Sequence, residues 1–334
     1  MIDQRILPRR FEYLHCGTMD EMIDAIRSMA IRGAPALAVA GAYGMALELL
    51  QPAANVRDQA RNAAVRLIAA RPTAVNLSWG VNRLLKIVND LNVRERDLPR
   101  MILAEAHRMA DEDVRVNRKL AENGAALIED GDTIIHHCNT GSLAVVEWGT
   151  ALGAIRFAHE QGKKIHVLVD ETRPRLQGSR LTAWECEQYG IPYEIITDNM
   201  AGYFIRSGKV QKVFFGADRV AANGDVVNKV GSYMLSLAAH ANHVPVYSVF
   251  PVSTLDLTIA NGDLIPIEER DADEVLGIEF HGEPVAPLGA KVRNPAFDVT
   301  PHELITALVT EKGVIKPPFE RNLVNCVYNT SLDG

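Results

Sequence analysis

A regular alternation of short apolar runs and longer helical patterns constrains this chain more than any other feature. From Asp132 onward the apolar runs are TIIHHC, KIHVLVD, PYEIIT, VQKVFFGAD and VPVYSVF, and segments such as LAVVEWGTALGAIRFAHEQG and SRLTAWECEQYG separate them. The alternation predicts βαβ units and a parallel sheet covered by helices on both faces. Gly162 and Gly190 stand just before the next apolar run, where helix C-caps are expected.

The chain from Met1 to about Arg118 has a different rhythm, because its patterns are mainly helical. MDEMIDAIRSMAIRG, QARNAAVRLIAARP and LPRMILAEAHRMADEDVRVNRKLAENG repeat apolar residues at three- and four-residue spacing. The run GAPALAVAGAYGMALELL is apolar enough to suggest a membrane span, but it contains Pro35 and Glu48, so a buried helix is the better interpretation. We therefore predict two domains, a helical one over 1–118 and a parallel-sheet one over 119–334, with a last short helix in HELITALVTEKG after Pro301.

Composition narrows the class of ligand and the compartment. A formal net charge of -7 gives no general electrostatic footprint for nucleic acid, so we expect a small-molecule ligand and no nucleic-acid or membrane partner. The 4 cysteines lie far apart, no C-x-x-C occurs, and the N-terminus lacks a secretory pattern. These features predict a cytoplasmic protein with reduced thiols.

Cys138 ends the apolar run TIIHHC and is followed by Asn-Thr-Gly and an apolar helical pattern. In open α/β sheets ligands bind beyond the carboxyl ends of the strands, where loops lead into helix N-termini. A helix N-terminus favours a thiolate and also suits a phosphate. The alternative is a small, buried, unreactive cysteine. His136 and His137 do not favour a zinc site, because adjacent strand residues point to opposite faces, so we predict no metal.

Four further segments carry polar groups at comparable places. VLVDETRPRLQGS puts Gln177 in a loop after a strand, FFGADRVAANGDVVNKVGS carries Asp218, Asn228 and Lys229, IRGAP puts Arg32 at a helix start, and NLSWGVNRLL puts Arg83 on a helix. Each of these residues alone has an ordinary structural interpretation as a cap, a surface charge or a loop hydrogen bond. Together, cations in glycine-rich loops suit a phosphate, while a thiol and a carboxylate at strand ends suit proton transfer.

The same residues resemble a known family, the methylthioribose-1-phosphate isomerases of methionine salvage. The matching segments run nearly from end to end: IRGAPALAVAGAYGMAL, NLSWGVNRLL, HCNTGSLA, DETRPRLQGSRLTAWE, GADRVAANGDVVNKVGSY, IPIEER and NPAFDVTPHELITALVTEKG. Relatives of that family include archaeal ribose-1,5-bisphosphate isomerases and regulatory subunits of the eukaryotic translation-initiation exchange factor 2B. The resemblance implies a small, mainly helical N-terminal domain with a few strands, a Rossmann-like C-terminal domain, and a homodimer or larger assembly.

The resemblance also implies the site residues. Cys138 and Asp218 would be the catalytic pair. The residues implied to bind substrate are Arg32, Gly33, Ala34, Arg83, Gln177, Asn228 and Lys229. No cofactor is implied, and the ligand would be a sugar phosphate.

The reaction implied is conversion of 5-methylthioribose 1-phosphate into 5-methylthioribulose 1-phosphate. Asp218 would act as the acid that assists ring opening, and hydrogen would then move from C2 to C1 either as a proton, with Cys138 as base, or as a hydride. The sequence leaves three alternatives open: 5-deoxyribose 1-phosphate or ribose 1,5-bisphosphate as substrate, or a regulatory subunit that only binds a sugar phosphate or nucleotide. A dinucleotide-dependent dehydrogenase is disfavoured, because no G-x-G-x-x-G fingerprint occurs.

Overall fold

The computed structural model describes residues 1–328, so the predicted domain end at 334 lies outside the described residues. The described chain forms two compact units, and each is considered by itself below. The first unit comprises Met1–Arg118 and the separate segment Thr140–Gly149. The second unit comprises Lys119–Asn139 and the described chain from Thr150 onward.

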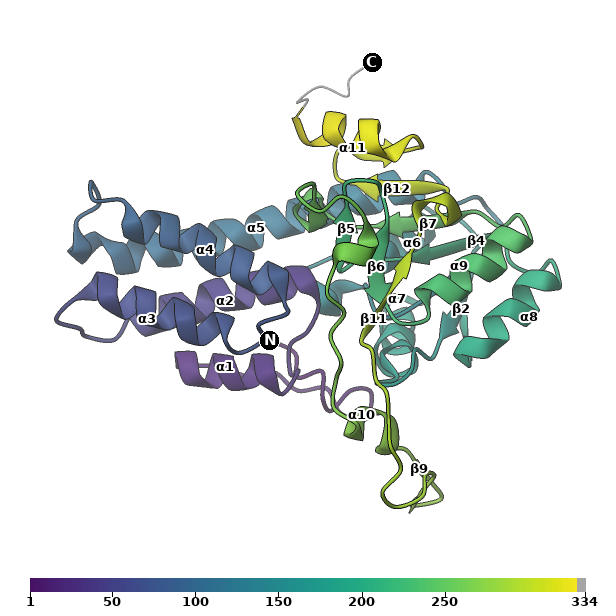
Figure 1. Cartoon of the computed structure of the whole chain (residues 1–334), viewed down its shortest axis with the longest axis horizontal. Coiled ribbons are helices and arrows are strands. Elements are labelled where there is room, and N and C mark those ends of the chain that lie inside the picture. The colour runs from purple at the N-terminus through teal and green to yellow at the C-terminus, as the bar shows by residue number, and fades with distance from the viewer. Residues whose placement is uncertain (329–334) are drawn as a thin grey trace. The chain divides into compact units, whose positions relative to one another are not determined.

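Helices make up the first unit, as the sequence patterns predict (Figure 1). They are α1 (Met19–Arg27), α2 (Ala34–Leu49), α3 (Val56–Ile68), α4 (Val75–Asn89), the 3-10 turn η1 (Glu95–Asp97), most of α5 (Leu98–Ala125), and the 3-10 turn η2 (Ser142–Ala144). No named strand lies in Met1–Arg118, and the few strands expected there are reduced to an isolated bridge between Ile2 and Tyr13. The segment between these two residues contains Pro8 and no apolar alternation that would extend the pairing.

The apolar run that resembled a membrane span is α2, and it is buried in the first unit, as predicted. It packs against α4 through small residues. A side chain added at Gly41 would stand 2.6 Å from Leu77, and one added at Gly80 would stand 2.5 Å from the Ala38 carbonyl oxygen. Among residues 1–328, no helix combines the length and the hydropathy that crossing a bilayer requires.

The second unit is built on a seven-stranded sheet of order β13-β12-β7-β4-β1-β2-β3. The strands are β1 (Thr133–His136), β2 (His166–Asp170), β3 (Tyr193–Ile196), β4 (Lys212–Phe215), β7 (Val246–Val249), β12 (Ala307–Thr310) and β13 (Gly313–Ile315). All neighbours pair in parallel except β12 and β13, which are antiparallel. The five predicted strands are β1, β2, β3, β4 and β7. The order 3-2-1-4 followed by two further parallel strands is the Rossmann order, which confirms the predicted fold class.

Both faces of this sheet are covered. Val213 and Phe215 of β4 join a buried cluster with Leu235 and Leu323, whereas Phe214 points to the opposite face and packs against Tyr247. The helices and turns of this unit are α6 (Ala151–Glu160), η3 (Gly178–Thr182, one π-helical turn), α7 (Ala183–Tyr189), η4 (Asp198–Met200), α8 (Ala201–Arg206), α9 (Ser232–Ala241), η5 (Val252–Thr254), η6 (Gly262–Leu264), α10 (Asp273–Leu276), η7 (His302–Leu304) and α11 (Phe319–Tyr328). As predicted, Gly190 caps α7 in the left-handed conformation.

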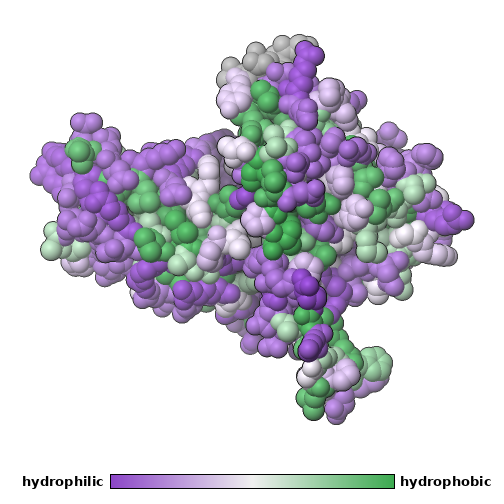
Figure 2. All heavy atoms as spheres, in the orientation of Figure 1, coloured by the Kyte–Doolittle hydropathy of each residue, from purple (hydrophilic) through white to green (hydrophobic). Residues whose placement is uncertain are grey.

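A smaller sheet lies beside the large one and has the order β11-β6-β5-β8. Its strands are β5 (Arg219–Ala221), β6 (Val226–Lys229), β8 (Leu255–Asp256) and β11 (Phe297–Thr300). β9 (Glu279–Phe280) and β10 (Glu283–Pro284) form a separate hairpin. Phe280 of β9 is exposed, and so are Val285 and Leu288, which follow β10. Figure 2 shows hydrophobic surface on the lobe where Figure 1 labels β9.

The prediction of a short helix in HELITALVTEKG is wrong. Only η7 is helical there, and the rest forms β12, a turn and β13. β12 is fully buried beside β7, so its short apolar run completes the sheet rather than the face of a helix. By periodicity alone, a short apolar run fits a helix and a strand equally well. This run forms a strand because it pairs with the edge of β7.

Candidate active site

The carboxyl ends of β4, β1 and β2 meet at one edge of the large sheet, because these three strands are parallel neighbours. Cys138 lies two residues beyond β1, and Asp218 lies three residues beyond β4. Chain connections leave β1 toward β2 and β3 on one side, while β4 and β7 lie on the other. The carboxyl end of the β1–β4 pair is therefore the topological switch point, where ligands bind in sheets of this type. Cys138 and Asp218 follow the two strands that flank it.

Cys138 is held in an unusual backbone conformation by two threonines. Its φ is 71°, a value that residues other than glycine rarely adopt. Its backbone N–H donates to Oγ1 of Thr172 over 2.9 Å, and its carbonyl oxygen accepts from Oγ1 of Thr182 over 2.7 Å. Both threonines are completely buried. Fully paired backbone groups keep the strained turn in one arrangement, and such strain is typical of functional positions.

The Cys138 side chain faces Gln177 from the loop after β2. Nε2 of Gln177 donates to Sγ of Cys138 over 3.3 Å, whereas Oε1 of Gln177 is buried and has no hydrogen-bond partner among the described residues. The loop closes tightly because Gly178 lies against the carbonyl group of Asp170, where no side chain fits. The glycine in RLQG therefore brings Gln177 to the sulfur.

The expected helix N-terminus after Cys138 is not there. The chain runs through η2 and a loop, and α6 begins only at Ala151. Gly141 and Gly149 form an isolated bridge across this loop, and a side chain on Gly149 would stand 2.6 Å from the Gly141 backbone. The apolar residues Leu143, Ala144 and Val145 are buried instead. The hydrogen bond to the Cys138 sulfur comes from Gln177 and not from a helix N-terminus.

Asp218, Asn228 and Lys229 come together through the small sheet. The backbone N–H of Asp218 donates to the carbonyl oxygen of Val227, which places Asp218 beside the end of β6. Asn228 is 3% exposed and donates to Oγ of Ser232. Lys229 is 7% exposed and donates to the carbonyl oxygen of Ala296 over 2.6 Å.

The charge of Lys229 is sensitive to its surroundings. Burial and repulsion from Arg270 lower the pKa of Lys229 to about 8, against the attraction of Cys138, Asp218 and Glu274. Those attractions show that the lysine shares one electrostatic environment with both members of the expected catalytic pair.

Two arginines of the loop after β2 have structural partners. Nη2 of Arg173 donates to the carbonyl oxygen of Val275, and Nη1 of Arg175 donates to Glu274 over 3.0 Å. These bonds anchor the loop that carries Gln177 to the segment around α10.

The remaining expected substrate residues belong to the first unit. Arg32, Gly33 and Ala34 form the turn into α2, where Gly33 has φ 99° and lies against the backbone of Ala144. Arg83, on α4, donates to Glu105 over 2.7 Å and to both carboxylate oxygens of Glu112. Its charge is thus matched within the unit, a pairing that the sequence pattern did not predict.

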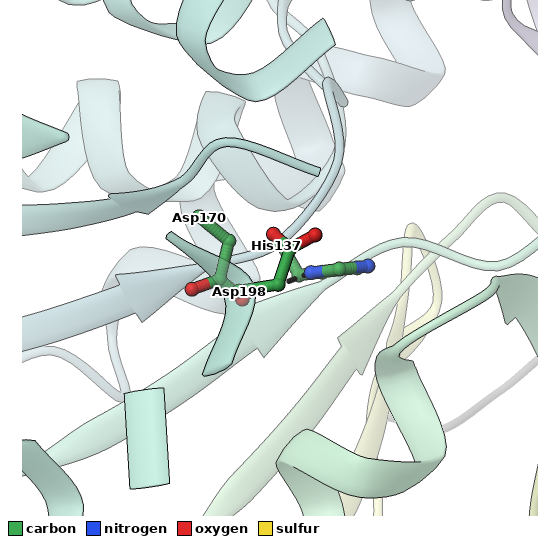
Figure 3. A group of neighbouring side chains, drawn as sticks. All are labelled: His137, Asp170 and Asp198. Carbon is green, nitrogen blue, oxygen red and sulfur yellow. Dashed lines mark hydrogen bonds and ion pairs between the residues drawn. The ribbon is translucent and has the colours of Figure 1, made fainter. Parts of the chain in front are cut away.

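A group of three side chains beside Cys138 has the spacing of a metal site. The potential ligand atoms of His137, Asp170 and Asp198 lie within 4.8 Å of one another (Figure 3). Most of these atoms are already used. Nδ1 and Nε2 of His137 bond to Asp170 and to the carbonyl oxygen of Val230, and the oxygens of Asp198 accept the backbone N–H groups of Thr172 and Arg173. Because only Oδ1 of Asp170 lacks a partner, the group fits an internal hydrogen-bond network better than a metal.

Comparison with known proteins decides the family. The family model described as "Initiation factor 2 subunit family" matches residues 30–317. The methylthioribose-1-phosphate isomerase of Thermotoga neapolitana is 50% identical over 324 residues, which cover 97% of this chain and 94% of that protein. This chain belongs to the initiation factor 2 subunit family and, within it, to the methylthioribose-1-phosphate isomerase family. The resemblance found in the sequence is thereby confirmed.

Solved structures of this family have the same fold. The crystal structure of 5-methylthioribose 1-phosphate isomerase from Pyrococcus horikoshii is 40% identical, with a TM-score of 0.90 over 98% of this chain and 92% of that chain. A structure described as the delta subunit of translation initiation factor eIF-2B from A. fulgidus is 44% identical, with a TM-score of 0.86 over 98% of this chain and 96% of that chain. Of these two similar structures, one is named as an isomerase and the other as an initiation-factor subunit.

Sequence reasoning missed the roles of four residues around the turn of Cys138, which are Thr172, Thr182, His137 and Asp170. The signal for Asp170 is its place at the end of the run VLVD. The threonines carry no signal in the sequence, because their role depends on a backbone conformation that only the folded turn defines.

Proposed function

We propose that this protein is an aldose-ketose isomerase that converts 5-methylthioribose 1-phosphate into 5-methylthioribulose 1-phosphate in methionine salvage. The observation that carries the proposal is the arrangement at the switch point. A thiol and a carboxylate follow the two flanking strands, and a buried lysine interacts electrostatically with both. The names of the enzymes that are about 50% identical to this chain support the same reaction.

In the proposed reaction, Asp218 donates a proton to the ring oxygen, and the bond from that oxygen to C1 breaks, which leaves an oxocarbenium carbon at C1 that still carries the phosphate. Hydrogen then moves from C2 to C1. If it moves as a proton, Cys138 as thiolate removes it from C2 and returns it at C1. If it moves as a hydride, Cys138 orients the substrate instead. The proton that the C2 hydroxyl releases when the ketone forms returns to Asp218. In the proton route the Gln177 amide, which donates to the sulfur, stabilises the negative charge of the thiolate.

Gln177 also supports substrate binding. Its buried Oε1 has no partner among residues 1–328, and an unpaired buried acceptor costs about 1–3 kcal/mol. A sugar hydroxyl supplies the missing donor. Lys229 and Asn228 are proposed contacts for the phosphate and hydroxyl groups. Arg32, Gly33, Ala34 and Arg83 remain proposed substrate contacts from the first unit, and the homodimer remains a proposal as well.

The test is ketose formation from 5-methylthioribose 1-phosphate and 5-deoxyribose 1-phosphate, measured side by side with the purified protein. We expect turnover of the methylthio sugar, with the deoxy sugar as a second substrate. An apolar pocket separates such neighbours by only ~1–3 kcal/mol. No turnover of either sugar, together with tight binding of a sugar phosphate or nucleotide, would favour a regulatory subunit of the kind named in the A. fulgidus relative.

A further inference from the structure

His137 is the residue of this region whose surroundings are most specific and whose role the proposed reaction leaves open. Its side chain is 1% exposed and lies between β1 and the chain that follows β6. Nδ1 stands 2.9 Å from Oδ2 of Asp170, and Nε2 stands 3.1 Å from the carbonyl oxygen of Val230. Figure 3 shows the ring beside the carboxylates of Asp170 and Asp198.

Both partners of the ring are acceptors. A backbone carbonyl cannot donate a hydrogen bond, and neither can an ionised carboxylate. A neutral imidazole has a single N–H, so it satisfies only one of the two. The geometry therefore calls for an N–H on each ring nitrogen, which is the imidazolium form.

The electrostatics agree with this geometry. Burial alone would lower the pKa of His137, but the hydrogen bond and charge of Asp170, with the charges of Cys138 and Asp198, raise it to about 9. Burial raises the pKa of Asp170 to about 6, although His137 opposes that shift. His137 and Asp170 thus form an ion pair between about pH 6 and about pH 9. Burial raises the pKa of Asp298 on β11, and the charges of His137 and Lys229 act in the opposite direction.

The neighbouring histidine differs in charge. His136 is completely buried, and Nδ1 stands 3.0 Å from the carbonyl oxygen of Phe214. Burial lowers the pKa of His136 to about 3, so this ring stays neutral. Of the two adjacent histidines, His137 is therefore charged and His136 is neutral, so a substitution of His136 is a control for substitutions of His137.

His137 also fixes the chain that carries the proposed phosphate contacts. Val230 directly follows Asn228 and Lys229, and its carbonyl group is bonded to the ring. Gly231 has φ 107°, and a side chain there would stand 2.9 Å from Cε1 of His137. The loop is thus packed on the imidazole face and bonded to its edge.

We propose that His137 is a positioning residue that, as an imidazolium, ties the Asn228–Lys229 strand end to the turn of Cys138 and places a fixed positive charge beside that turn. The proposal deepens the proposed isomerase function and rests on it, because 5-methylthioribose 1-phosphate is the substrate only under that function. The cation favours the anionic form of the thiol and any negative charge that develops on the substrate next to it.

Two neutral variants separate the effect of the His137 charge from the effect of its hydrogen bond to Val230. His137→Gln keeps a donor at the position of Nε2, toward Val230, and His137→Asn keeps a donor at the position of Nδ1, toward Asp170. The readouts are the rate of alkylation of Cys138 by iodoacetamide between pH 6 and 9, and the Kd for 5-methylthioribose 1-phosphate. All proteins carry Cys16→Ser, because Cys16 is the only one of the cysteines that is not buried.

We expect both variants to slow alkylation at pH 7 by about tenfold or more, because each removes the cation. Only His137→Asn, which releases Val230, is expected to weaken binding by about tenfold. Asp170→Asn keeps an acceptor for Nδ1 but removes the anion, so His137 should lose its proton at lower pH and alkylation should fall mainly above that pH. His136→Asn keeps a donor toward Phe214 and removes no charge, so its alkylation profile should match the parent protein.

An unchanged alkylation profile in both His137 variants, with only a lower melting temperature, would overturn the proposal and leave His137 as a packing residue. Equal loss of affinity in both variants would overturn the tie through Val230. Alkylation does not depend on turnover, so absence of isomerase activity in the parent protein would refute the proposed reaction without deciding the role of His137.

Discussion

Gln177 and Cys138 are 39 residues apart in the sequence, and the amide of the first donates a hydrogen bond to the sulfur of the second over 3.3 Å. The contact exists because the loop after β2 folds back over the end of its own strand at Gly178. Two neighbouring parallel strands thus bring a neutral donor to a thiol, and the same amide presents a buried, unpaired oxygen. One side chain is in this way suited both to polarise the sulfur and to bind a substrate hydroxyl.

Gln177→Leu tests this double role. The change removes the donor to the sulfur and the proposed acceptor for substrate, so kcat/KM should fall about tenfold or more, since an unmade buried hydrogen bond costs ~1–3 kcal/mol. Stability should be unchanged or slightly higher, because a buried unsatisfied oxygen is removed as well. Steady-state kinetics and thermal unfolding of the same samples provide both values. A kcat/KM equal to that of the parent protein would remove Gln177 from the site.

Gly178→Ala should be destabilising, because the new side chain would fall on the Asp170 carbonyl group. We expect a loss of about 1–3 kcal/mol in the free energy of unfolding and a displaced Gln177. Gly202→Ala is the matched control. Gly202 lies in α8 with open space around it, so alanine should be neutral or stabilising by up to about 1 kcal/mol. Equal effects of the two substitutions in urea unfolding would contradict this explanation of the loop.

The pH dependence of substrate affinity should follow Lys229. Burial and Arg270 lower the pKa of Lys229 to about 8, so the side chain is charged below this pH and neutral above it. KM should therefore rise between pH 7 and pH 9. Lys229→Arg keeps its charge throughout this range, so any activity it retains should show a flat KM. A flat KM in the parent protein would remove Lys229 from phosphate binding.

The lowered pKa of Lys229 also affects the free energy of unfolding, which should rise with pH while substrate affinity falls. The unfolded chain keeps the lysine proton up to about pH 10.4, whereas the folded protein releases it near pH 8. Between these values the unfolded state binds more protons, so the contribution of this group to the free energy of unfolding rises with pH. Comparing the parent protein with Lys229→Arg by chemical unfolding at pH 8 and pH 10 isolates this contribution.

Arg83→Met should destabilise the first unit in a pH-dependent way. Arg83 holds the pKa of Glu112 below its usual range, and although burial acts in the opposite direction, Arg108 and Arg83 do the same for Glu105. Lowered carboxyl pKa values stabilise the protein above the unfolded pKa, and this contribution is lost as the pH falls through the folded value. We expect a cost of about 1–2 kcal/mol at pH 7, because Glu112 is 40% exposed, and a smaller cost at pH 4. Equal costs at both pH values would show that the arginine acts through packing alone.

Much of the large sheet was predictable, because its strands are short apolar runs between helical patterns. Each of the five predicted apolar runs contains one strand, namely β1, β2, β3, β4 or β7. Gly190 ends α7, as expected. The region after Cys138 and the run after Pro301 were not predictable. In the first, the loop closed by Gly141 and Gly149 overrides an apolar pattern of helical type. In the second, a free sheet edge turns an ambiguous run into β12.

The candidate site shows the same division. The strand ends that carry Cys138 and Asp218 could be found from the sequence, because parallel strands align their carboxyl ends. The partners of these residues could not. The hydrogen bonds from Thr172 and Thr182 to the Cys138 backbone depend on a left-handed turn, and the ion pair of Arg83 depends on the packing of α4 against α5.

Turnover by Cys138→Ser and Asp218→Asn, measured with binding of 5-methylthioribose 1-phosphate to the same proteins, tests the central claim most directly. Both substitutions keep the size of the side chain, so folding and binding should persist while ketose formation falls by several orders of magnitude, because each removes a group that exchanges a proton with the sugar. Near-normal ketose formation in either variant, with folding and binding intact, would contradict the assignment of that residue to the reaction.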